Sequence, residues 1–395
     1  MPAADATPRG LVGYTGKKKA ASLITIPPLP SLTIKGMRIS LPIIQGGMGV
    51  GVSLYPLACA VAVAGGLGLI SSACLNRMVS ERIGHKVDTS EAVRHEVVAA
   101  KAGGGYAGIN IMVALQRDYE TSVRAAIEAG ADAIVSGAGL PLSLPAIMPP
   151  RDTALIPIVS SARALDLICR RWERQHYRPD AVVLEGPLAG GHLGFRADQV
   201  DLAENTLERL LPPVKQVAVA HGDFPLIVAG GIYTHEDIRR FLALGADGVQ
   251  MGTRFLATHE SSASEAYKEA VLRARPEDIL VANDPGSPCG LPFRVLQESP
   301  MYQSALARRR TPKCDKGYVL LKDAEGRFTR CPAKEDNEHS FCICNGLLSA
   351  TGYNSGTEEP LYTAGTSAAR VDRILSVGDL MADLAGVRQM APSVG

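Results

Sequence analysis

Residues 181–195 read AVVLEGPLAGGHLGF, a short apolar run followed by a glycine-rich loop around His192. The apolar run predicts a strand that is buried on both faces. The loop would start at the carboxyl end of that strand, where its glycines let the backbone approach a ligand closely. An imidazole titrates near neutral pH, so His192 could exchange a proton with a substrate. The alternative is a histidine that only stabilises its own loop.

The same unit recurs along the chain. Short apolar runs occupy residues 43–45, 67–70, 107–111, 133–136, 156–159, 181–184, 226–229 and 248–251, and helical patterns occupy 55–64, 91–102, 119–129, 162–175, 204–211, 234–244 and 263–272. Apolar strands that alternate with helices predict parallel crossovers and an α/β fold. Eight such units predict a closed (β/α)₈ TIM barrel. A doubly wound sheet is the alternative, but the pattern shows no switch point.

The predicted barrel spans residues 38–295. Residues 1–37 are polar and interrupted by prolines, which indicates an N-terminal arm. Residues 296–395 form a C-terminal extension, which contains several cysteines and an amphipathic helical pattern over 371–384. This last helix would serve either as a lid over the barrel or as the contact of a homodimer, and the sequence does not separate the two roles.

Composition narrows the class of partner. The net charge is +1 and the basic runs at 17–19 and 308–310 are short, which argues against binding to nucleic acid. The longest apolar tract, 57–70, contains Gly65 and Gly66, so it predicts a helix, a turn and a strand rather than a membrane span. The N-terminus lacks the apolar core of a signal peptide. We therefore expect a cytoplasmic protein that acts on a small molecule.

The active site of a TIM barrel lies at the carboxyl ends of its strands. Small residues and glycines follow nearly every predicted strand, which would clear the barrel mouth for a flat ligand. Gly230-Gly231 and Gly252-Thr253 follow the last two strands, where backbone N–H groups can hold a phosphate. Gln45 and Asn110 would place amides on the opposite side. This combination predicts flavin mononucleotide (FMN) with its ring across the barrel mouth.

The motifs within residues 43–294 resemble those of the nitronate monooxygenases and of their relatives, the flavin-dependent enoyl-acyl-carrier-protein reductases. They are PIIQGGM at 42–48, AGGLG at 64–68, GINIM at 108–112, GAG at 137–139, EG and AGGHLG within 185–194, AGGI at 229–232, and MGTRF at 251–255. The resemblance implies an FMN-containing barrel in which His192 is the catalytic acid or base. The residues expected around the cofactor are Gln45, Gly46, Gly47, Met48, Asn110, Glu185, Gly191, Gly230, Gly231, Gly252 and Thr253.

Three functions are consistent with these motifs. A nitronate monooxygenase would convert an alkyl nitronate into a carbonyl compound and nitrite, and His192 would remove the α-proton of a neutral nitroalkane. A reductase would take electrons from NAD(P)H and pass them to an enoyl thioester or a quinone. A non-catalytic phosphate-binding scaffold is the third, but a scaffold has little use for a titratable His192 at the barrel mouth. The first is the predicted function.

Four cysteines in the C-terminal extension predict a metal site. Cys314, Cys331, Cys342 and Cys344 lie mostly among polar residues. Four thiolates can hold a 4Fe-4S cluster or a tetrahedral zinc ion, although the spacing matches neither a ferredoxin run nor a zinc ribbon. A cluster beside a flavin would favour electron transfer, so the prediction prefers iron–sulfur to zinc and would support the reductase alternative.

Overall fold

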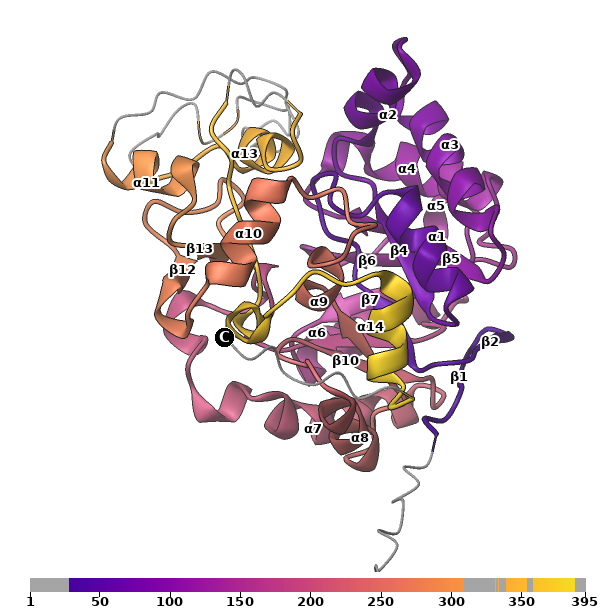
Figure 1. Cartoon of the computed structure of the whole chain (residues 1–395). Helices are drawn as coiled ribbons and strands as arrows, with labels where there is room; N and C mark the ends of the chain where they lie inside the picture. Colours follow the sequence, from indigo (N-terminus) through magenta and orange to yellow (C-terminus); the bar gives the residue numbers. More distant parts are fainter. Residues whose placement is uncertain (1–27, 309–330, 332, 334–338, 354–357, 388–395) are drawn as a thin grey trace, which may run out of the picture.

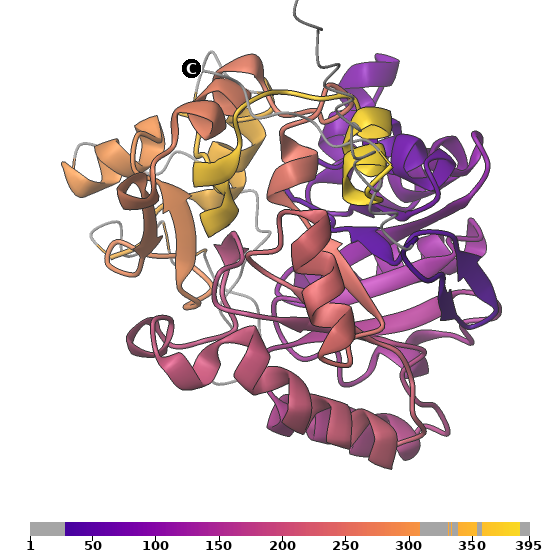
Figure 2. The same ribbon diagram turned by 60° about the horizontal axis from the view of Figure 1, so that its bottom comes forward.

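The computed structural model describes residues 28–308, 331, 333, 339–353 and 358–387. Its central strands are β3 (Ile43–Gln45), β4 (Leu67–Ser71), β5 (Tyr106–Met112), β6 (Ala133–Gly137), β7 (Ala154–Val159), β8 (Val182–Glu185), β10 (Leu226–Ala229) and β11 (Gly248–Met251). They close into a parallel barrel in the order β10-β11-β3-β4-β5-β6-β7-β8. Helices surround this barrel (Figures 1 and 2). The predicted (β/α)₈ fold and its eight strands are confirmed.

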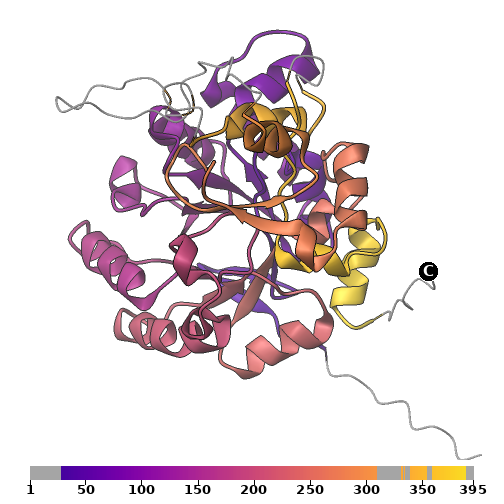
Figure 3. The same ribbon diagram turned by 90° about the vertical axis from the view of Figure 1, so that its left-hand side faces the viewer.

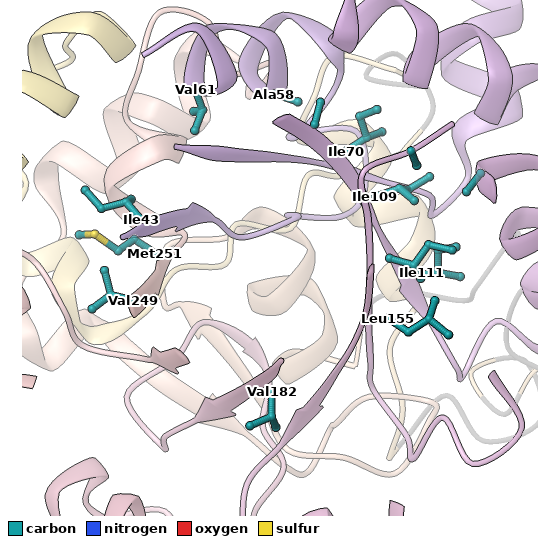
Figure 4. Packing of buried hydrophobic residues seen from close by; sticks show 14 of the residues in the cluster. Ile43, Ala58, Val61, Ile70, Ile109, Ile111, Leu155, Val182, Val249 and Met251 are labelled. Carbon is teal, nitrogen blue, oxygen red and sulfur yellow. The ribbon is translucent and has the colours of Figure 1, made fainter. Parts of the chain in front are cut away.

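Alternation along each strand separates two apolar layers. In β8, Val182 and Leu184 pack outward against the helices, whereas Val183 belongs to the cluster inside the barrel. Figure 4 shows part of the outer layer, with Val182 labelled among residues of several other strands. Because side chains alternate with a period of two, the residue after Leu184 points inward again. This is how Glu185 comes to face the inside of the barrel at its carboxyl end.

The surrounding helices include six that begin within three residues of their predicted starts and three that were not predicted, at residues 75–83, 144–147 and 253–256. They are α1 (Tyr55–Val63), α2 (Leu75–Ile83), α3 (Thr89–Lys101), α4 (Gln116–Glu128), α5 (Leu144–Ile147), α6 (Ala162–Glu173), α7 (Leu207–Ala220), α8 (His235–Ala243) and α9 (Thr253–Leu256). Side-chain caps fix several starts. The hydroxyl of Thr234 accepts a hydrogen bond from the backbone N–H of Asp237, and the carboxylate of Asp237 accepts one from the N–H of Thr234. Such reciprocal caps satisfy N–H groups that have no partner within the helix.

Helix α7 is longer than predicted. The expected helix ended at residue 211, directly before Pro212-Pro213, because proline removes a backbone donor from a helix. In the structure α7 continues through both prolines to Ala220. Leu207, Leu211 and Val214 are all buried and recur at helical spacing, so the helix keeps one apolar face along its length. Packing of that face against the barrel outweighs the local cost of the prolines.

Part of the predicted N-terminal arm closes the amino end of the barrel. Strands β1 (Leu32–Ile34) and β2 (Met37–Ile39) form an antiparallel hairpin. Its alternate residues, among them Leu32 and Ile39, are buried in the same cluster as the barrel interior. Residues 1–27 of the predicted arm lie outside the described residues. The hairpin thus gives residues 32–39 a structural role that their sequence did not indicate.

A second sheet lies across the carboxyl end of the barrel. It consists of β12 (Ile279–Ala282), β13 (Phe293–Leu296) and β9 (Gly191–His192), in that order and antiparallel. Helices α10 (Glu265–Arg273), α11 (Pro300–Leu306) and α13 (Ile343–Ser349) accompany it. Figure 3 shows these orange and yellow segments over the barrel. The short strand β9 comes from the His192 loop, so this sheet joins the C-terminal part of the chain to the barrel.

Helix α14 (Val377–Leu384) completes the ring of helices around the barrel, and its predicted role as a lid or dimer contact stays a prediction. It contacts α1, α8 and α9. Val377, Leu380, Met381 and Leu384 are buried in the same apolar cluster as the outer layer of the barrel. The residues between α9 and α14 therefore form an insertion before the last barrel helix, and the apolar face of α14 is used within the chain.

No described helix is long and apolar enough to cross a membrane.

We expect Leu380→Ala to lower the free energy of unfolding by about 2–5 kcal/mol, because Leu380 is fully buried and its truncation leaves a cavity. The exposed Val387 provides the control, and Val387→Ala is expected to change stability by less than about 0.5 kcal/mol. Equilibrium unfolding in denaturant measures both. Equal stability of the two variants would contradict the placement of α14 on the barrel.

Candidate active site

A cavity opens at the carboxyl ends of the barrel strands, beneath the insertion. Most of the residues predicted around a cofactor line it together with His192, and they come from the carboxyl ends of five barrel strands, β3, β5, β8, β10 and β11. They are Gly46, Gly47, Met48, Asn110, Glu185, Gly191, His192, Gly230, Gly231, Gly252 and Thr253. The structure therefore brings together residues that are up to two hundred positions apart in the sequence. Such a concave site at this end of a TIM barrel is where its chemistry takes place.

Gln45 is the predicted cofactor residue that does not line the cavity. Its side chain is fully buried, and its amide nitrogen donates to the carbonyl of Gly46 and to the hydroxyl of Ser53. Its carbonyl oxygen accepts a hydrogen bond from the backbone N–H of Leu69. Because Ile44 points into the barrel, the next residue points away from it. Gln45 thus supports the loop that carries Gly46 and Gly47, and it acts from behind the cavity wall.

Two of the lining glycines are required by close backbone contacts. A Cβ atom on Gly47 would lie 2.3 Å from the Cβ of Asn110. Gly230 has a φ of +102°, and a Cβ there would lie 3.0 Å from the carbonyl oxygen of Gly186. Only glycine adopts that backbone conformation without strain. These positions keep side chains out of the cavity floor, as the sequence predicted for a flat ligand.

Gln250 is a cavity residue that the sequence reasoning missed. It lies on β11 between the outward-facing Val249 and Met251, is only 7% exposed, and lines the cavity. Within the described residues its Oε1 atom has no hydrogen-bond partner. A buried acceptor without a partner costs stability, so its presence at a cavity wall indicates a ligand that donates to it. The alternation in GVQM was the signal that would have identified it.

Glu185 also faces the cavity. Burial at the end of β8 raises the pKa of this carboxyl to about 7. A carboxyl group that titrates near neutral pH can donate a hydrogen bond as well as accept one. Glu185 thus offers a bound ligand either a donor or an acceptor at physiological pH.

The loop that carries His192 is held by the insertion. Strand β13 pairs with β9 so that Phe293 lies opposite His192 and Arg294 opposite Gly191. The guanidinium group of Arg294 is buried, and it donates to the carbonyl oxygens of Pro187 and Ala189 at 2.7 and 2.9 Å. Burial lowers the pKa of this guanidinium. These bonds satisfy carbonyl groups of a loop that has little regular structure of its own.

A second segment of the insertion closes the opposite side of the same loop. The backbone N–H of Thr366 donates to the carbonyl of Leu188 at 3.1 Å, and that of Gly365 donates to the hydroxyl of Thr253 at 3.0 Å. Thr363, Ala364 and Gly365 line the cavity beside the predicted phosphate-binding loop. The sequence reasoning missed them because they follow Thr253 by more than a hundred residues and belong to no recognised motif.

His192 contacts groups on both sides. Its ring meets that of Phe293 edge-on, with centroids 4.7 Å apart and planes at 77°. Its Nε2 atom lies 3.2 Å from the hydroxyl of Ser287, which in turn lies 2.9 Å from the Sγ atom of Cys289. The imidazole is half-buried in the cavity wall. It is thus fixed in orientation while one face remains available to a ligand.

The described cysteines of the predicted metal site do not form a metal-binding group of three or more. Cys342 precedes the first turn of α13 and is buried, Cys344 lies within α13 on the cavity wall, and Cys331 is half-buried. Among the described residues, no group of three or more histidine, cysteine, aspartate or glutamate side chains could hold a metal ion. Cys314 lies outside the described residues. The metal site therefore stays a prediction without support from the described part of the chain.

The cavity residues fit FMN. The Oε1 atom of Gln250, which has no partner among the described residues, can accept a hydrogen bond from the flavin ring. The carboxyl of Glu185 can donate one to the ring or accept one from it. At Gly230, Gly231 and Gly252 no side chain covers the backbone at the cavity wall, so a phosphate group can approach the backbone N–H groups there. A flat heterocycle with a phosphate tail satisfies both features.

Comparisons with known proteins identify the family of this chain. The nitronate monooxygenase family model matches residues 31–386. Over 119 residues the chain is 42% identical to nitronate monooxygenase from Pseudomonas aeruginosa. This match covers 29% of this chain and 32% of that enzyme. Over 273 residues it is 26% identical to a probable nitronate monooxygenase from Staphylococcus haemolyticus, covering 63% and 74% of the two chains.

A solved structure, FabK from Thermotoga maritima, is similar over most of the chain. The TM-score is 0.63 at 27% sequence identity, and the likeness covers 87% of this chain and 91% of FabK. Because the family model spans the barrel, the insertion and α14, the resemblance of the strand-end motifs extends to the whole described fold. The chain belongs to the nitronate monooxygenase family.

Proposed function

We propose that this protein oxidises alkyl nitronates to a carbonyl compound and nitrite, with bound FMN and molecular oxygen. The observation that carries the proposal is the position of His192. It lies on the wall of a cavity whose opposite floor is cleared by glycines, so a flat cofactor and a small substrate can both reach it. Family membership supports the same reaction.

Several residues would hold the cofactor. The backbone at Gly230, Gly231 and Gly252 would bind its phosphate, and Asn110, Glu185 and Gln250 would meet the polar edge of its ring. When bound, FMN supplies the electron chemistry by accepting electrons from the substrate and passing them to oxygen. The protein supplies position, exclusion of water and control of protons.

His192 would act on the substrate directly. A nitronate is an anion, and a protonated imidazole in the cavity wall would bind it and balance its charge. If the neutral nitroalkane enters instead, the unprotonated imidazole would remove the α-proton. The edge of the Phe293 ring and the hydroxyl of Ser287 hold the imidazole in place for either role.

The insertion gives the cavity an apolar wall. Ile343 and Leu347 of the insertion line it together with Val50 and Leu115 from barrel loops, and all four are buried in one apolar cluster. Apolar walls favour apolar ligand groups, at about 0.8 kcal/mol for each buried CH₂. This supports a substrate whose nitronate group lies near His192 and whose alkyl chain extends along α13.

A reductase that takes electrons from NAD(P)H is the second candidate. The likeness to FabK at 27% identity favours it, since one histidine could protonate the product of hydride transfer. The predicted iron–sulfur cluster would belong to this candidate, but the proposed oxidation does not depend on it. The two candidates differ in the donor of electrons.

The distinguishing experiment is the anaerobic absorbance spectrum of the purified protein. If nitronate oxidation is the function, the flavin bands persist with NADH or NADPH and bleach when a nitronate such as that of 1-nitropropane is added. Bleaching by the nicotinamide donor alone would contradict the proposal and favour the reductase. A boiled sample with free FMN is the control for direct chemical reduction.

We expect His192→Ala to retain bound flavin and to lose turnover by about two to four orders of magnitude, the usual contribution of a general acid or base. Steady-state oxygen consumption with a nitronate measures turnover, and the flavin-to-protein absorbance ratio measures retention. His176, whose side chain is distant from the cavity lining, provides the control. Unchanged turnover in His192→Ala would refute the assigned role.

A charged side chain introduced at residue 252 tests where the phosphate of FMN binds. We expect Gly252→Asp to lose FMN, because a carboxylate there repels a phosphate. The matched variant Gly252→Ala should keep it, because a Cβ atom would lie 3.6 Å from Met48, an ordinary contact, and φ is −109°. Flavin fluorescence after dialysis measures retention. Equal retention in both variants would place the phosphate elsewhere.

A further inference from the structure

A segment of the insertion forms one end of the cavity wall. It comprises residues 363–367, which we call the strap, and four of its five residues line the cavity. The strap packs tightly against the His192 loop, since a Cβ atom on Gly190 would lie 2.5 Å from the backbone nitrogen of Gly365. The 3₁₀ helix η4 (Thr366–Arg370), which begins in the strap, contacts α9. The strap therefore meets the loop after β11, where the proposed function places the phosphate of FMN.

The strap carries a buried hydroxyl at this end of the cavity. Ser367 is only 6% exposed, and it lines the cavity. The part of the chain that the structure describes offers its hydroxyl no hydrogen-bond partner. Buried side-chain hydroxyls are normally hydrogen-bonded, and one that lies at a cavity wall without a partner is available to a ligand.

Thr253, directly after β11 and Gly252, has a hydroxyl in a related situation. It is 9% exposed and lines the cavity, and its Oγ1 atom accepts a hydrogen bond from the backbone N–H of Gly365 at 3.0 Å. A hydroxyl has a single proton to donate, and no described residue accepts the proton of Thr253. The bond from the strap thus holds this hydroxyl in place and leaves its proton for a ligand.

Neutral groups have to bind any anion at this end of the cavity. The described residues that line the cavity include no lysine or arginine. Arg254, which follows Thr253, donates instead to the carbonyl of Tyr233 at 2.9 Å and to the carboxylate of Asp383 at 3.0 Å. A phosphate would therefore depend on N–H and O–H donors, and hydrogen bonds to a charged acceptor are about twice as strong as those between neutral groups.

Tyr267, on α10, fixes the start of the strap. Its hydroxyl donates to the carbonyl of Thr363 and accepts the backbone N–H of the same residue, the second bond at 2.9 Å. Its ring is fully buried and stacks on that of Tyr362, with centroids 4.9 Å apart. Because both bonds go to one residue, they fix its orientation two positions before Gly365.

We propose that Ser367 binds the phosphate of FMN, that its hydroxyl and that of Thr253 both donate to phosphate oxygens, and that Tyr267 is a positioning residue that holds the strap for them. This inference rests on the FMN binding of the proposed function but not on the reaction that follows. The insertion would then complete a phosphate site that the glycines after β10 and β11 begin.

Riboflavin lacks the phosphate of FMN, so the two flavins separate phosphate binding from ring binding. We expect Ser367→Ala to raise the Kd for FMN about tenfold or more and to leave the Kd for riboflavin within about twofold of wild type. Fluorescence recovery on dilution of the purified flavoprotein measures both, the second after exchange into riboflavin. Ser261→Ala is the matched control, because Ser261 is 5% exposed but does not line the cavity.

The positioning role of Tyr267 has its own test. Tyr267→Phe keeps the stacked ring but removes both bonds to Thr363, and we expect the Kd for FMN to rise about two- to tenfold while that for riboflavin is unchanged. In the double variant with Ser367→Ala the two losses should not add, because a displaced strap no longer presents the hydroxyl. Full additivity would overturn the positioning role.

The outcomes separate this inference from the proposed function. Equal losses of FMN and riboflavin affinity in Ser367→Ala, or an unchanged Kd for FMN, would overturn the inference even if nitronate is oxidised. If Ser367 binds a phosphate of NADPH instead, the Kd for FMN stays unchanged and only bleaching by NADPH weakens, which also counts against it. A loss confined to FMN in a protein that oxidises no nitronate would support the inference while rejecting the proposed reaction.

Discussion

The active site depends on the two hydrogen bonds from the buried guanidinium of Arg294 to the carbonyls of Pro187 and Ala189. The loop between β8 and β9 is rich in glycine, and fixing such a chain in one conformation costs more entropy than fixing other residues. Charge-assisted bonds and the pairing of β13 with β9 offset that cost. His192 has a defined position because residues of the insertion hold its loop.

The same insertion is bound to the barrel at its far end. Near its end the insertion passes Thr363 and Gly365 on the cavity wall and then leads into α14, which packs against α1, α8 and α9. Arg254, directly after β11, donates to the carboxylate of Asp383 on α14 at 3.0 Å. Completion of the ring of helices and completion of the active site therefore rely on the same stretch of chain, which couples stability to function.

Few charged side chains line the cavity, and several of its lining residues carry polar atoms. His192, Glu185 and Gln250 line the cavity together with glycines and an apolar wall that the insertion and barrel loops share. In such surroundings an ionised group is stabilised mainly by its immediate partners, because little water is present to solvate it. The pKa of the Glu185 carboxyl is raised, because burial alone acts on it. The pKa of the Cys289 thiol is lowered, because interactions with His192 outweigh its burial.

The sequence by itself determined the eight strands, the closed barrel and the glycine-rich part of the cavity lining, because strand periodicity and strand-end glycines are local patterns. Alternation within the strand could also have identified Gln250 and excluded Gln45, since both follow from which neighbours point inward. Only the tertiary structure decided the place of α14, the contribution of Thr363 to Gly365, and the Ser287–Cys289 contact with His192. These join segments far apart in the chain, and the long-range packing that brings them together leaves no periodic pattern in the sequence.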